Sequence, residues 1–199
     1  MNMVLPEPTR ITQLVANILD RLQIPYFVGG SLASSLHGIP RATQDADIVA
    51  DIKSEHIVPF VEALRTQFYV DEQMIRDAIE RRSSFNVIHL ETMFKVDVFV
   101  FRNELGREAM ARRERYQLSD QSASYIFLAT AEDIILSKLQ WFRLGEGTSE
   151  RQWLDVLGVL QVQGDRLDFP YLQRMAGQMG VHDLLRQAIE DAAIDTRDN

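Results

Sequence analysis

The stretch from Gly29 to Val49, GGSLASSLHGIPRATQDADIV, constrains the fold of this chain more than any other segment. A glycine pair and a serine directly follow a short apolar run, so we expect a strand, a tight turn and a short helix. Asp45 and Asp47 come later, just ahead of two β-branched residues where a second strand is expected. Residues two positions apart in a strand point to the same side. Because adjacent carboxylates repel each other, the pair indicates a site for a cation or a shared proton.

Composition limits the classes of protein that this chain can belong to. The 199 residues suffice for one large domain or two small ones, and 46% apolar and 25% charged residues are typical of a globular protein. No apolar run is long enough to span a membrane, and no signal-peptide pattern opens the chain, so we expect a cytoplasmic protein without a membrane partner. With no cysteine, disulfides and cysteine-based zinc sites are excluded. The net charge of −8 argues against broad duplex DNA binding.

The pattern of the first half predicts strands and helices in alternation. Thr9 is expected to cap a first helix, and a hairpin is expected where FNVIHL and KVDVFVF flank a turn. In the second strand of that hairpin, Lys95, Asp97 and Phe99 share one face. Asp97 is then either part of an exposed strand face or a third acid that completes a metal site with Asp45 and Asp47.

The second half is predicted to be mostly helical, apart from a strand at YIFLAT. Thr130 with Asp133 resembles a capping box at the start of one helix, and Ser149 with Gln152 resembles another. Lys138 falls inside the apolar stripe of the first of these helices, where a lysine either extends to solvent or is aimed at an anion. Taken alone, the pattern favours extension to solvent.

One acid of the second half lies off its helix's apolar stripe. Asp155 stands beside Gly158, so we expect another element to approach the helix closely there. Together the patterns predict an α+β fold, with a small mixed sheet flanked by helices and a helical C-terminal part. We expect a first domain over residues 1–104 and a mostly helical domain over residues 105–199 that contributes to the active-site cleft.

Familiar phosphate-binding motifs are absent, which narrows the chemistry. The sequence contains neither G-x-x-x-x-G-K-[ST] nor G-x-G-x-x-G. Gly29, Gly30 and Ser31 remain, at the start of a helix where backbone amides can hold an anion.

In combination, these residues resemble a known signature. GGSLASSLHGIPRATQDADIV is similar to the GG-S…D-x-D motif of the DNA polymerase β-like nucleotidyltransferase superfamily, and KVDVF resembles the strand with its third carboxylate. ATAEDIILSKLQWF and SERQWLDVLGVL resemble helices of the AbiEii/MenA-type nucleotidyltransferases, a branch associated with toxin–antitoxin and phage-defence systems. The resemblance spans about residues 24–160.

The resemblance implies a role for each matching residue. Gly29, Gly30 and Ser31 would contact the triphosphate of a bound nucleotide, and Lys138 would meet its phosphates. Asp45, Asp47 and Asp97 would hold magnesium as a pair of ions, and Asp155 would belong to the active site with Lys138.

The expected activity is magnesium-dependent transfer of a nucleoside monophosphate to a hydroxyl group, with an antitoxin as a partner if the chain is a toxin. The acceptor stays open between a tRNA 3′ end, a protein hydroxyl and a small molecule such as an aminoglycoside. Two alternatives are a catalytically silent nucleotide-binding or regulatory protein of the same fold, and a purely structural role for the acids.

Overall fold

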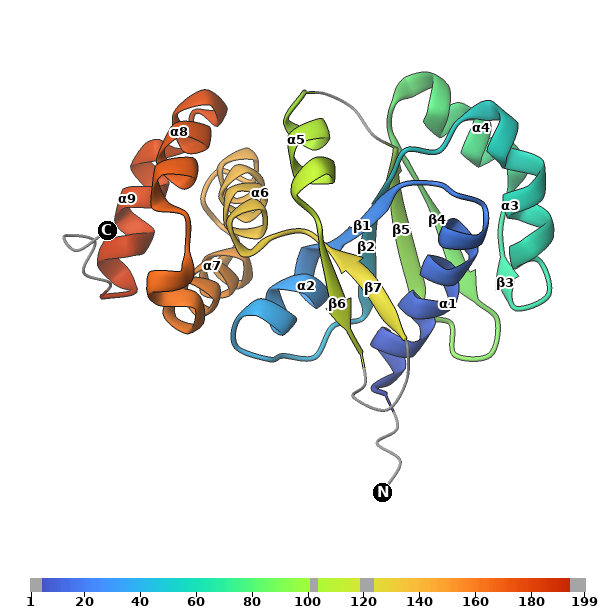
Figure 1. Ribbon diagram of the computed structural model, residues 1–199, viewed down its shortest axis with the longest axis horizontal. Helices are drawn as coiled ribbons and strands as arrows, with labels where there is room; N and C mark the ends of the chain where they lie inside the picture. The colour runs from blue at the N-terminus through green and yellow to red at the C-terminus, as the bar shows by residue number, and fades with distance from the viewer. Residues whose placement is uncertain (1–4, 101–103, 119–123, 194–199) are drawn as a thin grey trace. The chain divides into compact units, whose positions relative to one another are not determined.

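A seven-stranded mixed sheet carries the acidic residues in the computed structural model, which describes residues 5–100, 104–118 and 124–193 (Figure 1). The strand order is β3-β4-β5-β2-β1-β7-β6. Pairing is parallel between β2 and β5 and between β1 and β7, and antiparallel elsewhere. The strands are β1 (Tyr26–Gly29), β2 (Asp45–Ala50), β3 (Phe68–Tyr69), β4 (Ser84–His89), β5 (Lys95–Val100), β6 (Glu114–Gln117) and β7 (Tyr125–Leu128).

Nine α-helices accompany the sheet in the described residues: α1 (Glu7–Arg21), α2 (Gly30–His37), α3 (Ile57–Leu64), α4 (Glu72–Arg81), α5 (Glu104–Arg112), α6 (Ala131–Leu144), α7 (Glu150–Gln163), α8 (Phe169–Met179) and α9 (His182–Asp191). Two short 3₁₀ helices are η1 (Ser54–His56) and η2 (Gly164–Arg166). The predicted α+β class, with a mixed sheet, flanking helices and a helical C-terminal part, is confirmed. Within the described ranges, no helix combines the length and the apolar character that crossing a membrane requires.

The side chains of β2 and β5 alternate between two environments. One set is buried: Ala46, Ile48, Ala50, Val96, Val98 and Val100. Helices α1, α3 and α4 pack against one another and against the sheet, and they cover this apolar side (Figure 1). The alternate residues of the same strands are half-exposed, and they include the three predicted acids. The alternation thus orients the acids away from the core.

The chain divides into two compact units. Unit 1 holds the described residues up to Leu32 and those from Thr43 to Ala129; unit 2 holds Ala33–Ala42 and the described residues from Thr130 onward. The boundary expected after residue 104 therefore falls inside unit 1. The reason is that β7 pairs with β1 and β6 pairs with β7, which extends the sheet by two strands.

Unit 2 is built mainly from α6, α7, α8 and α9, and buried acids tie its helices together. The backbone N–H of Asp168 donates to Glu132 Oε1 at 2.9 Å, and the hydroxyl of Tyr171 donates to Asp133 Oδ1 at 2.6 Å. Thr130 caps α6 by accepting from the Asp133 N–H, as predicted. Glu132 and Asp133 at the start of α6 thus have a structural role, because they accept hydrogen bonds from the first turn of α8 and from its N-cap residue.

Several local expectations are wrong. Helix α1 begins at Glu7 after Pro6, so Thr9 lies buried inside the helix and does not cap it. Ser149 stands at the start of α7 but its side chain makes no capping hydrogen bond. The short strands β3 and β6 were not predicted. Both lie at the edges of the sheet.

Candidate functional site

The three predicted acids lie on one face of unit 1. In the parallel pairing of β2 with β5, Asp47 lies directly opposite Asp97, and Asp45 lies directly opposite Lys95. Neighbouring strands are about 4.8 Å apart, so side chains paired in this way are immediate neighbours. We call Asp45, Asp47, Lys95 and Asp97 the acid face.

The glycine turn that follows β1 is shaped by this acid face. Gly30 opens α2 with φ of +56°, and a Cβ placed there would lie 1.7 Å from Asp47 Oδ2 and 2.6 Å from Asp47 Cγ. Asp47 is also opposite Gly29 in the β1–β2 pairing. A Cβ on Gly29 would meet nothing closer than 3.9 Å. Gly30 is therefore required twice, for its left-handed backbone and for the space that the Asp47 carboxylate fills.

Lys95 supplies a positive charge among the acids. Its Nζ lies 2.7 Å from Asp97 Oδ2. This hydrogen bond raises the pKa of the Lys95 ammonium above its usual value; burial opposes the increase, and the negative charges of Asp97, Asp45 and Asp47 add to it. The ammonium thus lies in the combined field of all three carboxylates.

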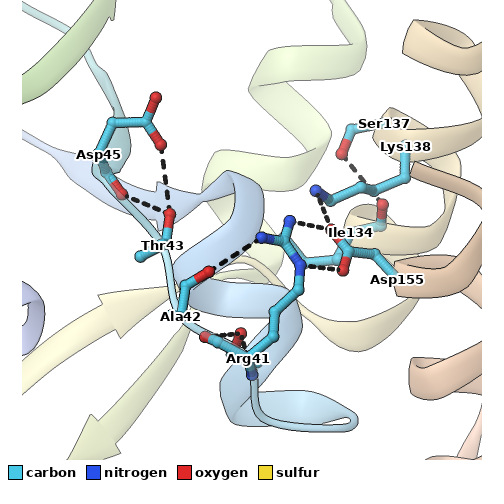
Figure 2. A network of polar contacts seen from close by, with 9 residues as sticks. Arg41, Ala42, Thr43, Asp45, Ile134, Ser137, Lys138 and Asp155 are labelled. Carbon is cyan, nitrogen blue, oxygen red and sulfur yellow. Dashed lines mark hydrogen bonds and ion pairs between the residues drawn. The ribbon is translucent and has the colours of Figure 1, made fainter. Parts of the chain in front are cut away.

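Asp45 is held by the segment that leads into β2. Thr43 Oγ1 lies 2.9 Å from the backbone oxygen of Asp45 and 3.2 Å from its Oδ1 (Figure 2). In the described part of the chain, no three His, Cys, Asp or Glu side chains converge as a metal-binding group. The Asp97 carboxylate is bonded to Lys95, and Asp45 is bonded to Thr43.

The acid face nevertheless fits magnesium in its chemistry. Carboxylate oxygens are hard ligands of the kind that Mg²⁺ prefers, and two or three of them suffice when phosphates and water complete the shell. The register places three such groups on one face of the adjacent strands β2 and β5, where the Lys95 ammonium already lies 2.7 Å from Asp97 Oδ2.

A second charged cluster forms inside unit 2. Arg41 binds the Asp155 carboxylate with two hydrogen bonds, from Nε to Oδ1 at 2.6 Å and from Nη2 to Oδ2 at 2.7 Å. Lys138 Nζ donates to the same Oδ2 at 2.6 Å (Figure 2). Lys138 is 3% exposed and Asp155 is 8% exposed. The lysine is therefore buried and paired with an anion, and it does not extend to solvent as its helix pattern alone favoured.

Close backbone packing positions this cluster. A Cβ on Gly38 would lie 2.7 Å from the backbone nitrogen of Val159, and one on Gly158 would lie 3.3 Å from that of Ile39. The segment after α2 thus runs directly against α7, and Arg41 follows it into reach of Asp155. The close approach predicted from Asp155 beside Gly158 is confirmed.

The ionisation of Asp155 depends on its two partners. Burial alone would raise the pKa of this carboxyl group, but the hydrogen bonds and charges of Arg41 and Lys138 outweigh it and lower the pKa below its ordinary value. Two cations share one carboxylate, so this cluster carries a formal charge of +1.

The predicted site residues thus fall into two sets. Gly29, Gly30, Ser31 and the three acids belong to unit 1, and Lys138 and Asp155 belong to unit 2. A joint role of the two sets stays a prediction. The Lys95–Asp97 and Arg41–Asp155 ion pairs were not predicted from the sequence. A signal for the first was present, since Lys95 and Asp97 share a strand face.

Comparison with known proteins supports the fold. No protein-family model and no curated protein matches the sequence. An antigenic nucleotidyltransferase-like protein from Paracoccidioides brasiliensis is similar in structure, with a TM-score of 0.62 and 15% identity, over 94% of this chain and 91% of that one. The antibiotic-resistance factor ANT(2″)-Ia is similar with a TM-score of 0.55 and 11% identity, over 94% of this chain and 100% of that one. The lincosamide antibiotic adenylyltransferase LnuA is similar with a TM-score of 0.51 and 14% identity, over 79% of this chain and 98% of that one. This chain therefore has a nucleotidyltransferase-type fold.

We predict that Gly30→Ala destabilises the protein while Gly29→Ala does not. The first change forces a left-handed alanine and a clash with Asp47, with an expected loss of about 2–4 kcal/mol in the free energy of unfolding. The matched change at Gly29 makes only an ordinary van der Waals contact, 3.9 Å from Phe27 Cε2, and is expected to stay within about 0.5 kcal/mol of the parent. Urea unfolding followed by circular dichroism measures both. Equal stability of the two variants would contradict the assigned Gly30–Asp47 contact.

A second prediction concerns the Asp155 ion pairs. At pH 7, Asp155→Asn is expected to lower the free energy of unfolding by about 3–5 kcal/mol, because Lys138 stays buried without an anion. The lowered pKa means that this stabilisation is present above pH 3.8, the ordinary pKa of aspartate, and is lost as pH falls through the folded-state pKa. The difference between the parent and the variant should therefore shrink below pH 3.8.

Tryptophan fluorescence during urea unfolding reads out this unit directly, since both tryptophans, Trp141 and Trp153, lie in unit 2. Asp183→Asn is the matched control, because Asp183 pairs with Arg143 at the surface of the same unit. We expect little change from it at any pH. A constant difference between Asp155→Asn and the parent down to pH 2 would contradict the assigned pairing.

Proposed function

We propose that this protein is a magnesium-dependent nucleotidyltransferase that moves a nucleoside monophosphate from a nucleoside triphosphate to a hydroxyl acceptor and releases pyrophosphate. One observation carries the proposal: Asp47 and Asp97 are paired in register on adjacent strands, with Asp45 on the same face and the Gly30 turn against Asp47. The nucleotidyltransferase-type fold supports it.

Asp45, Asp47 and Asp97 would hold the metal, as a pair of ions. Bound magnesium would neutralise phosphate charge and lower the pKa of the acceptor hydroxyl. The acids are half-exposed, so an incoming ligand can approach this face of the strands from solvent.

The chain's own groups would perform the remaining work. The acceptor oxygen forms a bond to the α-phosphorus while the bond from that phosphorus to the bridging oxygen breaks, and pyrophosphate leaves. Asp97 would take the proton of the acceptor hydroxyl. The backbone N–H groups of Gly30 and Ser31, at the first turn of α2, would bind the phosphates that depart. We propose that Lys138, with Asp155 to hold it, meets those phosphates as well.

The biological setting is proposed on the AbiEii/MenA-type resemblance. It would be that of a cytoplasmic toxin with an antitoxin partner. For the acceptor, the comparisons offer two models: ANT(2″)-Ia in complex with adenylyl-2″-tobramycin, and the lincomycin-bound LnuA. A tRNA 3′ end and a protein hydroxyl are the other candidate acceptors.

A second candidate function is a catalytically silent nucleotide-binding or regulatory protein of this fold. The ion pair between Lys95 and Asp97 favours it, because a carboxylate bound to an ammonium group is not free to act as a ligand or as a base.

Transfer of labelled nucleotide separates the two functions. Purified protein is incubated with each α-³²P-labelled nucleoside triphosphate, Mg²⁺ and a cell extract, and RNA, protein and small molecules are then resolved. We expect label on one class of acceptor, and a loss on the order of 100-fold or more in Asp47→Asn, because a misplaced reacting group costs about this much.

Asp51→Asn is the matched control for this assay. Asp51 directly follows β2, outside the paired positions of β2 and β5. At the surface, its Oδ2 lies 3.8 Å from Lys53 Nζ. Its substitution should leave transfer unchanged. Transfer that survives in Asp47→Asn would contradict the proposed site, and absence of any labelled product would favour the silent protein.

A further inference from the structure

Lys95 is the positive charge on a face of three carboxylates. Three carboxylates and one ammonium give the acid face a formal charge of −2, and without Lys95 the charge would be −3. The ammonium is bonded to Asp97 Oδ2 at 2.7 Å, and its side chain is 42% exposed, so it can leave without disturbing the core.

The strand register explains why the ammonium turns toward the acids. On one flank of β5, Lys95 is paired with Asp45 of β2. On the other flank, it is paired with Ile88 of β4, which offers no charge, and Asp97 is paired there with the neutral Asn86. Among the residues that the structure describes, the negative charges that act on Lys95 are those of Asp97, Asp45 and Asp47.

We propose that Lys95 is an internal counter-cation of the acid face, which a divalent metal ion must displace from Asp97 in order to bind. The inference rests on the metal site of the proposed function and adds a residue that sets its affinity. In the metal-free protein, the ammonium offsets the repulsion between carboxylates that the register forces together. An incoming metal ion competes with it for the same Asp97 oxygen, so Lys95 weakens metal binding.

Displacement also changes what Lys95 can do. Once its ammonium leaves Asp97, that carboxylate regains both oxygens for a metal ion or a proton. The freed ammonium stays on the face where phosphates would lie, because it is anchored on β5 two residues from Asp97. The metal-free protein is thereby kept in a form in which Asp97 is occupied.

The test is the affinity for Mn²⁺ alone, without nucleotide, measured by the electron paramagnetic resonance signal of the free ion at pH 7. Lys95→Met keeps the length of the side chain and removes the charge. We expect it to bind Mn²⁺ about tenfold more tightly than the parent, because one competing charge at ion-pair distance is gone. Lys95→Arg keeps the charge and should stay within about threefold of the parent.

Lys53→Met is the matched control, because Lys53 pairs with Asp51 outside the paired positions of β2 and β5. It should leave the affinity unchanged. Lys95→Gln, a second neutral variant, repeats the measurement if the methionine variant does not fold, as judged by circular dichroism. Unchanged or weaker Mn²⁺ binding by a folded neutral variant would overturn the inference.

Failure of the inference can be told apart from failure of the proposed function. If the parent protein transfers nucleotide but its affinity for Mn²⁺ does not change in Lys95→Met, the inference alone falls. If Lys95→Met tightens Mn²⁺ binding and neither protein transfers nucleotide, the inference stands and the proposed function falls. If no variant binds Mn²⁺, both fall.

Discussion

The parallel register between β2 and β5 is the constraint on which the candidate site depends. It places Asp47 beside Asp97 and Asp45 beside Lys95, while the alternate residues of both strands bury against helices. A slip of one residue would move every acid of one strand into the apolar core, at a large cost in free energy. The pairing of the acids is thus protected by the same burial that holds the sheet together, and the repulsion among the acids is offset locally by Lys95 and Thr43.

Much of the fold could be predicted because its signals are local. Alternation in β2 and β5 and apolar stripes in α6 and α7 identify elements that bury one side only. The edge strand β6, with the sequence ERYQ, has three exposed residues of four, and β3 has two residues, so neither carries a pattern. The unit boundary depends on the missed β6 and on the pairing of β7 with β1, a long-range contact that no local pattern shows.

The candidate site was predictable in its residue types and less so in its contacts. Spacing alone placed Asp45 and Asp47 on one side of a strand, and alternation placed Asp97 and Lys95 together on the next. The sequence could not show that the Asp47 carboxylate occupies the space where a side chain at position 30 would begin. Nor could it show that Arg41 binds Asp155, 114 positions further along the chain. Both contacts arise from tertiary packing. Lys138 illustrates the same limit, since a helical stripe cannot distinguish a lysine at the surface from one with a buried partner.

The location of a bound metal ion tests the acid face most directly. Mn²⁺ titrated into ¹⁵N-labelled protein broadens the amide resonances nearest to the ion and leaves distant ones sharp. We expect the amide resonances of Gly30, of the acids of β2 and of Asp97 to broaden first. In Asp47→Asn, we expect the same titration to leave these resonances sharp. Broadening centred on another acidic region, such as the end of α9 at Glu190 and Asp191, would contradict a metal site on β2 and β5. So would the same broadening in both proteins.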